Sequence, residues 1–174
     1  MKPLFKPDKY YRTAFDIDFE KLIQEGKKVI AFDLDNTLVP HFVKDPDDKV
    51  MQLLTKVQKL GFEFVVISNN NYGRVKRFCE PLGIKYYYGA KKPLKFTFKR
   101  ILDDYNITKN ELVIVGDQIM TDVFGASRMG ITSIFVEPLA KKDIIYTKIN
   151  RQMERVLLKR LERKGLFKTG EYYD

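Results

Sequence analysis

The chain has 174 residues, of which 44% are hydrophobic, and its formal net charge is +9. This length fits one domain, and the 13 Phe and 10 Tyr residues exclude a disordered chain. No apolar run approaches the ~18 residues of a membrane span and the N-terminus lacks the apolar core of a signal peptide, so we expect a cytoplasmic protein.

From residue 29 onward, short apolar runs alternate with segments of helical periodicity. The expected strands cover residues 29–32, 62–67, 84–88, 112–115 and 131–136, and the expected helices cover 47–60, 72–82, 94–105 and 122–129. Apolar strands that alternate with helices are typical of a parallel sheet with helices on both faces. The sequence therefore predicts an α/β, Rossmann-like fold.

Two local features are interpreted as structural. Thr108 and Glu111 have the spacing of a capping box, but a predicted strand follows at once, so we expect a turn there. Cys79 is the single cysteine, which excludes an internal disulfide. It lies in a helical segment with no nearby histidine, so we expect a core residue and not a catalytic thiol.

Polar clusters follow four of the predicted strands, at the edge of the sheet where the carboxyl ends of parallel strands meet. Ligands of parallel α/β sheets bind at that edge. The clusters are Asp33 to Thr37 after the first strand, Ser68-Asn69-Asn70 after the second, Lys91-Lys92-Pro93 after the third, and Gly116 to Asp122 after the fourth. Four clusters at one edge indicate a single site more strongly than any one motif does.

The residue types in these clusters suit the hydrolysis of a phosphomonoester. Carboxylates such as Asp33 and Asp117 are ligands that Mg²⁺ prefers, and a carboxylate can also attack phosphorus. Asp35 can protonate the leaving oxygen and later deprotonate water. Lys92 and the Ser68 hydroxyl can bind the phosphate oxygens. The sequence therefore predicts a Mg²⁺-dependent phosphatase with an aspartate nucleophile.

Taken in order, the clusters resemble the motifs of the haloacid dehalogenase superfamily of phosphatases, over about residues 28–136. The resemblance implies that Asp33 is the nucleophile, that Asp35 is the general acid and base, and that Lys92 balances charge. It also implies a Mg²⁺ site. The implied metal-binding residues are Asp33, Asp35 through its backbone carbonyl, Asp117, and Asp122, which supports the metal or the lysine.

The same resemblance implies which residues bind the phosphate group of the substrate. They are Thr37, Ser68, Asn69 and Lys92. Lys91 is an alternative for the lysine role, and Lys92 is preferred because it directly precedes the proline. The longer run of motifs is similar to the YqeG-type branch, subclass IIIA. Relatives in that branch dephosphorylate phosphatidylglycerophosphate to phosphatidylglycerol, which implies an anionic phospholipid substrate.

The motif spacing leaves no room for a cap domain. About 30 residues separate Thr37 from Ser68, and predicted elements fill this gap and the next one. We expect an N-terminal extension over residues 1–27 that packs on the core, a phosphatase core over 28–138, and a basic amphipathic C-terminal helix and tail over 139–174. The site should be open. The loop with His41, Phe42 and Val43 either lines its entrance or is simply exposed to solvent.

The C-terminal segment carries most of the positive charge. Residues 141–168 contain ten Lys or Arg and three acids. Apolar residues recur there every three or four positions, at Ile145, Ile149, Met153, Val156, Leu157 and Leu161. Such a basic amphipathic helix either makes peripheral contact with an anionic membrane, at its inner face, or packs its apolar stripe on the core.

Three functions are compatible with these patterns. The leading one is a phosphatidylglycerophosphate phosphatase. The second is an uncapped phosphatase of a soluble nucleotide or sugar phosphate. The third is a non-catalytic protein that binds nucleic acid through its basic tail. No nucleic-acid motif is visible and all the carboxylates are present, so a specific nucleic-acid partner is not expected. The sequence carries no signal of oligomeric state.

Overall fold

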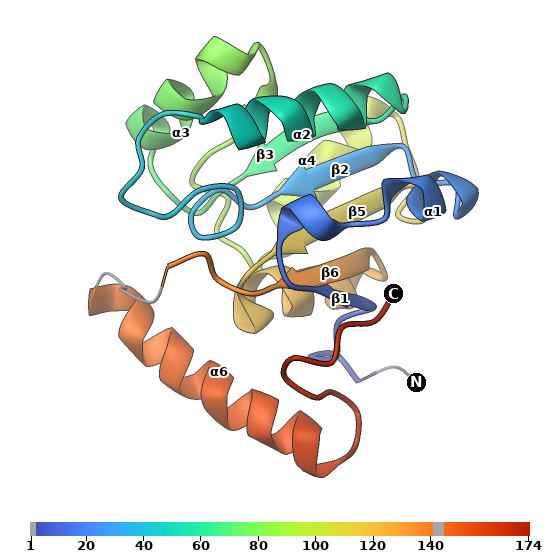
Figure 1. The fold of residues 1–174 in the computed structure, drawn as a ribbon, viewed down its shortest axis with the longest axis vertical. Helices are drawn as coiled ribbons and strands as arrows, with labels where there is room; N and C mark the ends of the chain where they lie inside the picture. The colour runs from blue at the N-terminus through green and yellow to red at the C-terminus, as the bar shows by residue number, and fades with distance from the viewer. Residues whose placement is uncertain (1–2, 141–144) are drawn as a thin grey trace.

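The computed structural model describes residues 3–140 and 145–174, with side chains for 3–140 and 152–174. The described residues form a six-stranded sheet in which every neighbouring pair is parallel, in the order β1-β6-β5-β2-β3-β4 (Figure 1). The strands are β1 (Lys9–Tyr11), β2 (Val29–Phe32), β3 (Glu63–Ile67), β4 (Lys85–Tyr87), β5 (Leu112–Gly116) and β6 (Thr132–Val136). Because all strands run the same way, their carboxyl ends meet at one edge.

Helices cover both faces of the sheet (Figure 1). They are α1 (Phe19–Gln24), α2 (Asp48–Lys59), α3 (Tyr72–Cys79), α4 (Lys95–Tyr105), α5 (Phe124–Met129) and α6 (Ile145–Arg163), with short helical turns at Ala14–Asp16, Glu80–Leu82 and Ile119–Val123. Helices α1, α2 and α3 pack on one face, and α4 and α5 pack on the other. The predicted α/β architecture is confirmed, and no cap domain interrupts the described residues.

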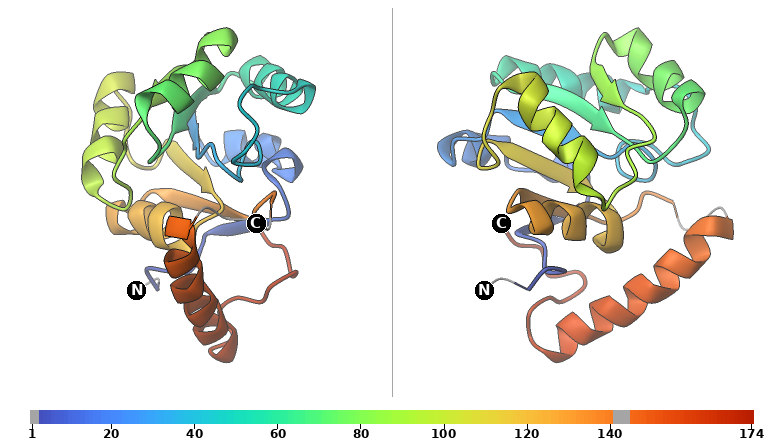
Figure 2. Two further views of the ribbon diagram at one scale, coloured as in Figure 1. Left: turned by 90° about the vertical axis from the view of Figure 1, so that its left-hand side faces the viewer. Right: turned by 180° about the vertical axis from the view of Figure 1, so that it is seen from behind.

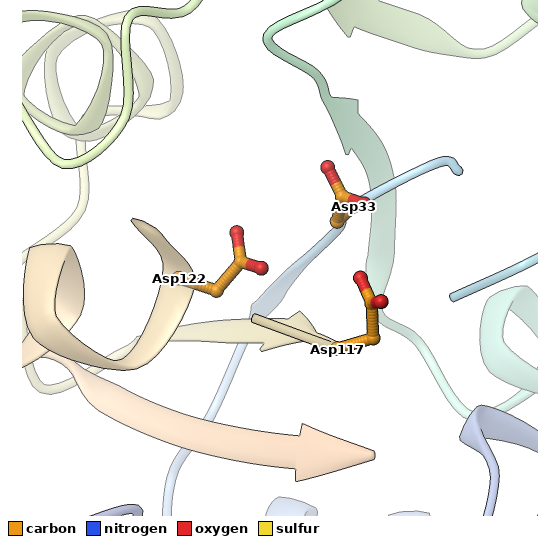
Figure 3. A group of neighbouring side chains, drawn as sticks. All are labelled: Asp33, Asp117 and Asp122. Carbon is orange, nitrogen blue, oxygen red and sulfur yellow. The ribbon is translucent and has the colours of Figure 1, made fainter. Parts of the chain in front are cut away.

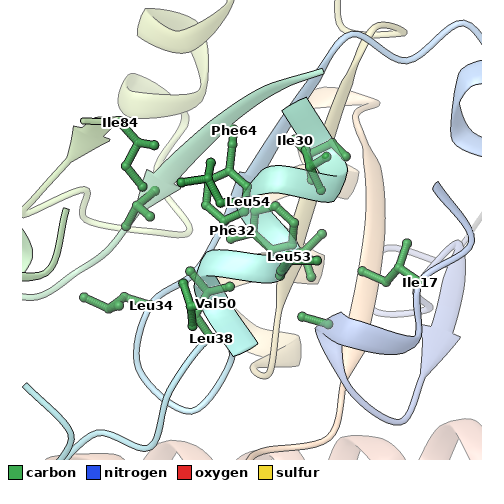
Figure 4. Close-up of a cluster of buried hydrophobic side chains, with 14 of the residues drawn as sticks. Ile17, Ile30, Phe32, Leu34, Leu38, Val50, Leu53, Leu54, Phe64 and Ile84 are labelled. Atoms are coloured by element: carbon green, nitrogen blue, oxygen red, sulfur yellow. The ribbon is translucent and has the colours of Figure 1, made fainter. Parts of the chain in front are cut away.

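The hydrophobic core has a layer on each face of the sheet because the strands are apolar on both sides. On one face, Phe32 and Phe64 from neighbouring strands stack with ring centroids 4.4 Å apart, beneath Leu53 of α2 (Figure 4). On the other face, Val65 packs in the cluster that contains Phe98 of α4. Each buried CH₂ group in these layers contributes about 0.8 kcal/mol to the stability of the fold. This packing holds in place the strand ends that carry the site.

Cys79 is part of this core, as the sequence predicts. The residue is fully buried, and burial raises the pKa of its thiol to about 12. A thiol with so high a pKa carries almost no thiolate at neutral pH, which is the nucleophilic form.

The N-terminal segment contributes an edge strand that the sequence pattern does not predict. Residue Tyr10 of β1 is in register with Phe135 of β6. On its outer side, Tyr10 exchanges backbone hydrogen bonds of 2.6 Å and 2.9 Å with Tyr173 of the C-terminal tail. The tail thereby pairs with backbone groups that an edge strand would otherwise expose.

The basic C-terminal helix is present as α6, and it extends from the rest of the molecule (Figure 2). The side chains of Ile145 and Ile149, which belong to the predicted apolar stripe, lie outside the described residues. Farther along, Leu161 is buried, whereas Met153 and Val156 are exposed. In the part of α6 whose side chains are described, the stripe is therefore fully buried at Leu161, partly buried at Leu157, and exposed nearer the N-terminal end. Among the described residues, no helix is both long and apolar enough to cross a bilayer.

Candidate active site

Three buried aspartates, from the segments after β2 and β5, converge at the carboxyl edge of the sheet (Figure 3). Asp33 directly follows β2, Asp117 directly follows β5, and Asp122 lies in the helical turn Ile119–Val123. One carboxylate oxygen from each aspartate lies within 4.8 Å of the others. The sequence predicts that Asp33 and Asp117 lie at one edge of a parallel sheet, and in the structure their strands β2 and β5 are neighbours.

Lys92 reaches into the same cluster from the segment after β4. Its ammonium nitrogen lies 2.6 Å from Asp33 Oδ1 and 2.6 Å from Asp122 Oδ1, and it donates to the Ile67 carbonyl at 3.0 Å. The Lys92 side chain is 2% exposed, whereas Lys91 is exposed. Of the two lysines, the structure therefore places Lys92 beside the carboxylates.

Burial and charge oppose each other in this cluster. Burial raises the pKa of Asp33, and the Lys92 ammonium beside it acts in the opposite direction. Burial would also lower the pKa of Lys92, but the carboxylates of Asp122 and Asp33 more than reverse that effect, so its pKa lies above the usual range. The lysine therefore stays charged at neutral pH. A further cation at the cluster would favour the ionised form of Asp33.

The donor set of the cluster fits a hard divalent cation. Its ligand atoms are carboxylate oxygens, which Mg²⁺ and similar ions prefer. When ionised, Asp33, Asp117 and Asp122 carry three negative charges beside the single ammonium of Lys92. Placing a divalent cation among them would offset the cost of burying like charges close together.

Gly116 leaves room for the Asp122 carboxylate. A Cβ atom on Gly116 would lie 2.2 Å from Cγ of Asp122, a distance that no side chain tolerates. The Gln118 backbone N–H donates to Asp122 Oδ2 at 3.2 Å and fixes the carboxylate over the turn. The glycine in the Gly-Asp motif is therefore required by packing against Asp122.

The residues predicted to bind phosphate line the same edge, but Thr37, Ser68 and Asn69 form hydrogen bonds with other residues of the protein. The Thr37 hydroxyl is buried and donates to Asp117 Oδ1 at 3.4 Å. The Ser68 hydroxyl is also buried and accepts from the Asn70 N–H at 3.1 Å. The side-chain amide of Asn69 bonds both backbone groups of Lys92, at 2.7 Å and 3.1 Å. Asn69 thus holds the lysine segment in place.

Asp35 lies apart from the buried triad, and its carboxylate is held by two neighbours. Arg74 of α3 donates to Oδ1 from Nε at 3.2 Å and from Nη2 at 2.9 Å, and Asn70 donates to Oδ2 at 3.1 Å. The Asp35 side chain is 21% exposed, so it borders the open edge. The sequence does not identify Arg74 as a site residue. Arg74 lies in the first turn of α3, shortly after Ser68-Asn69, and no sequence pattern distinguishes it from other surface arginines.

Glu154 is a second contributor that sequence reasoning missed. It belongs to α6, is buried, and accepts hydrogen bonds from the backbone N–H groups of Ile119 and Met120. Those two residues begin the helical turn that carries Asp122. Helix α6 is therefore anchored to the loop of the site. In the sequence, Glu154 is one of three acids in a basic segment, and no local pattern indicates its contact with the turn.

Comparisons with known proteins agree with this arrangement. A family model described as "HAD-hyrolase-like" matches residues 89–138. The chain is 39% identical to "Probable phosphatase YqeG" of Bacillus subtilis, over 95% of this chain and 96% of that protein. It is 30% identical to "Phosphatidylglycerophosphate phosphatase 1, chloroplastic/mitochondrial" of Arabidopsis thaliana, over 86% of this chain and 46% of that protein.

A solved structure shares the fold at low sequence identity. The cobalt-bound deoxy-D-mannose-octulosonate 8-phosphate phosphatase of Haemophilus influenzae superimposes with a TM-score of 0.54 and 16% identity, over 86% of this chain and 96% of that chain. At this identity, the likeness concerns only the arrangement of strands and helices.

Proposed function

The chain belongs to the haloacid dehalogenase superfamily of phosphatases, in its YqeG family, and from this membership we propose that it hydrolyses phosphatidylglycerophosphate to phosphatidylglycerol. The observation that carries the proposal is the meeting of Asp33, Asp117, Asp122 and Lys92 at an uncapped edge. An open edge suits a phosphate on a large molecule. The name of the Arabidopsis relative supports the choice of lipid, although this chain matches 46% of its length.

We propose that Asp33 is the nucleophile. Its carboxylate oxygen attacks phosphorus, the bond from phosphorus to the ester oxygen breaks, and an aspartyl-phosphate forms. Lys92 Nζ lies 2.6 Å from Asp33 Oδ1, where its charge can offset that of the transferring group. Burial of Asp33 strengthens this electrostatic interaction, because water screens a buried charge less than an exposed one.

We propose Asp35 as the general acid and base. In the first half-reaction it gives a proton to the leaving glycerol oxygen. In the second it takes a proton from the water that attacks phosphorus, which releases phosphate and restores Asp33. The hydrogen bonds from Arg74 and Asn70 hold the Asp35 carboxyl at the rim of the site, so the carboxyl must turn from Arg74 to reach the leaving oxygen.

The remaining predicted residues would hold the metal ion and the phosphate. Asp33, Asp117, Asp122 and the Asp35 carbonyl would bind Mg²⁺, which when bound neutralises the phosphate dianion and orients it for in-line attack. Ser68 and the backbone N–H groups after β3 would bind phosphate oxygens. Thr37 would orient Asp117 through its hydrogen bond. Asn69 would act through Lys92, whose backbone it fixes.

We also propose that the protein works at the inner face of an anionic membrane as a peripheral protein. The basic helix α6 supports this, because its exposed residues Arg155, Lys159 and Arg160 lie beside exposed Met153 and Val156. Each basic residue near an anionic surface adds about 1 kcal/mol of attraction. The third function considered above, a non-catalytic nucleic-acid-binding protein, does not fit membership in a phosphatase family.

The proposed substrate is tested by measuring phosphate release from phosphatidylglycerophosphate in mixed micelles and from soluble nucleotide and sugar phosphates at matched concentrations. The lipid is expected to have the highest kcat/KM, and chelation of divalent cations should abolish its turnover. Faster turnover of a soluble ester would show that the enzyme is a phosphatase of small metabolites and would refute the lipid assignment.

A further inference from the structure

Large apolar side chains are exposed around the carboxyl edge of the sheet, where the site lies. Phe96 is 74% exposed, Phe42 is 64% exposed, and Leu94 is 53% exposed. Tyr72 and Tyr88 are each about half exposed. We call these five residues the apolar rim. Tyr72, Tyr88, Leu94 and Phe96 directly follow a strand or begin the next helix, and Phe42 lies in the connection from β2 to α2. These connections leave the carboxyl edge of the sheet, which faces the viewer in the left panel of Figure 2.

The rim is continuous with the catalytic segments. Leu94 and Phe96 come directly after Lys92 and Pro93, so one short segment both buries the site lysine and exposes two apolar side chains. Tyr72 begins α3, just after Ser68 and the asparagines of the second motif. Its ring lies 5.0 Å from that of Tyr88 and joins the two segments at the surface. A surface that contacts the rim would therefore lie against the mouth of the site.

The charges in the rim segment around Leu94 and Phe96 are positive. The segment from Tyr88 to Phe96 contains Lys91, Lys92 and Lys95 and no acid. Lys91 and Lys95 are exposed beside Leu94 and Phe96. Aromatic and aliphatic side chains mixed with lysine match the boundary between anionic headgroups and acyl chains, where apolar groups enter and ammonium groups stay at the phosphates.

We propose that the apolar rim docks on the surface of an anionic phospholipid bilayer, with Leu94 and Phe96 inserted among the headgroups. This inference deepens the proposed function, on which it rests, because it assigns the lipid contact to the edge of the site and not to α6 alone. With the rim seated, the bilayer covers the uncapped site and shields the transferring phosphoryl group from bulk water. A phosphomonoester in the headgroup layer then faces Asp33 without leaving the membrane.

The test measures binding to vesicles separately from catalysis. The full-length double variant Leu94→Ser/Phe96→Ser is compared with wild type by co-sedimentation with phosphatidylglycerol-rich vesicles, with no phosphomonoester present. The ionic strength is set to screen long-range attraction. The matched control is Ile23→Ser. Ile23 is 42% exposed near the end of α1, at the opposite edge of the sheet.

We expect the double variant to lose about tenfold or more in vesicle partitioning, because two apolar side chains no longer insert. The control should bind as wild type does. Both variants should hydrolyse a soluble ester, p-nitrophenyl phosphate, with unchanged kcat/KM, which also shows that they fold. Phosphatidylcholine vesicles should bind wild type less tightly, because they lack the anionic charge that Lys91 and Lys95 meet.

Three results would overturn the proposal: no vesicle binding by wild type, unchanged binding by the double variant, or loss of binding only in Met153→Ser, which would place the contact on α6. Failure of the proposed function gives a different result, since vesicle binding would persist while phosphatidylglycerophosphate in micelles is not hydrolysed. Binding of the rim to a protein partner would appear as the first of the three results.

Discussion

At the scale of single residues, Asp35 differs from the other aspartates because an arginine and an asparagine hold it outside the buried triad. If it is the acid and base of both half-reactions, Asp35→Asn should slow both and let the aspartyl-phosphate accumulate. Mass spectrometry of the variant quenched during turnover should detect a phosphoryl group on the peptide with Asp33. We expect kcat to fall by about 10²-fold to 10⁴-fold.

The control for this variant is Asp45→Asn. Asp45 lies in the same connection and is also paired with an arginine of α3, Arg77, but it is exposed. This variant should keep its activity. Equal losses in the two variants would mean that ion pairs with α3, and not proton transfer by Asp35, account for the effect.

Gly116 is a second residue whose role is local and steric. The side chain in Gly116→Ala would collide with the Asp122 carboxylate at 2.2 Å, so β5 or the following turn must shift. We expect a loss of about 1–3 kcal/mol in the free energy of unfolding, together with weaker binding of a divalent cation. Chemical denaturation and calorimetric titration with Mg²⁺ measure the two effects.

Gly73→Ala is the matched control for the glycine substitution. A Cβ on Gly73 in α3 meets Asn71 Oδ1 at 3.6 Å, an ordinary contact, and alanine favours a helix. Its free energy of unfolding should be unchanged or slightly increased. If Gly116→Ala were equally harmless, close packing of the turn against β5 would not explain the glycine.

At the scale of elements, the turn before β5 depends on Glu111. Its carboxylate accepts from the Thr108 N–H and hydroxyl at 2.8 Å each, and Lys28 Nζ lies 2.5 Å away. The Lys28 hydrogen bond and the two from Thr108 lower the pKa of Glu111 to about 2. The predicted turn at this position is thus confirmed, and the Glu111 carboxylate stabilises it by accepting hydrogen bonds from Thr108.

The lowered pKa of Glu111 makes the stability of the fold depend on pH, with stability lost as the pH falls. The folded state prefers ionised Glu111, so its contribution to stability is complete above the unfolded pKa of 4.5 and is lost as the pH falls toward about 2. Relative to wild type, Glu111→Gln should be destabilised at about pH 6, and the difference should shrink at about pH 3. Denaturant titrations at both pH values measure it. A difference that grows on acidification would contradict this assignment.

The sequence predicts β2 to β6 to within a residue or two: β2, β3, β5 and β6 are mainly apolar runs, and β4 follows Ile84 and the glycine that ends a predicted helix. It does not predict β1, although Lys9–Tyr11 has the same sequence as β4, because no neighbouring pattern marks it as a strand. Tyr10 is buried by Phe135, Phe167 and the C-terminal tail, partners that are distant in sequence. Local patterns carry no information on such contacts, so the edge strand could not be predicted.

At the scale of the whole molecule, the topology makes much of the site predictable from sequence. In a parallel sheet, residues after different strands share one edge, so the motifs predict that Asp33 and Asp117 lie at the same edge. That β2 and β5 are neighbours is known only from the structure. The contacts between motifs are not encoded in this way. Whether Asp35 faces the triad or Arg74, and whether Asn69 meets phosphate or the Lys92 backbone, depends on side-chain rotamers that only the folded structure defines.

The sharpest test of the proposed chemistry is phosphate release by wild type and by Asp33→Asn, each with Mg²⁺ and after chelation. We predict that wild type loses turnover when the cation is removed and regains it on addition. The kcat of Asp33→Asn should be lower than that of wild type by on the order of 10⁴-fold or more, because an amide cannot attack phosphorus. Its circular dichroism spectrum should be unchanged. Turnover by Asp33→Asn within tenfold of wild type, or wild-type turnover that chelation leaves intact, would contradict the account.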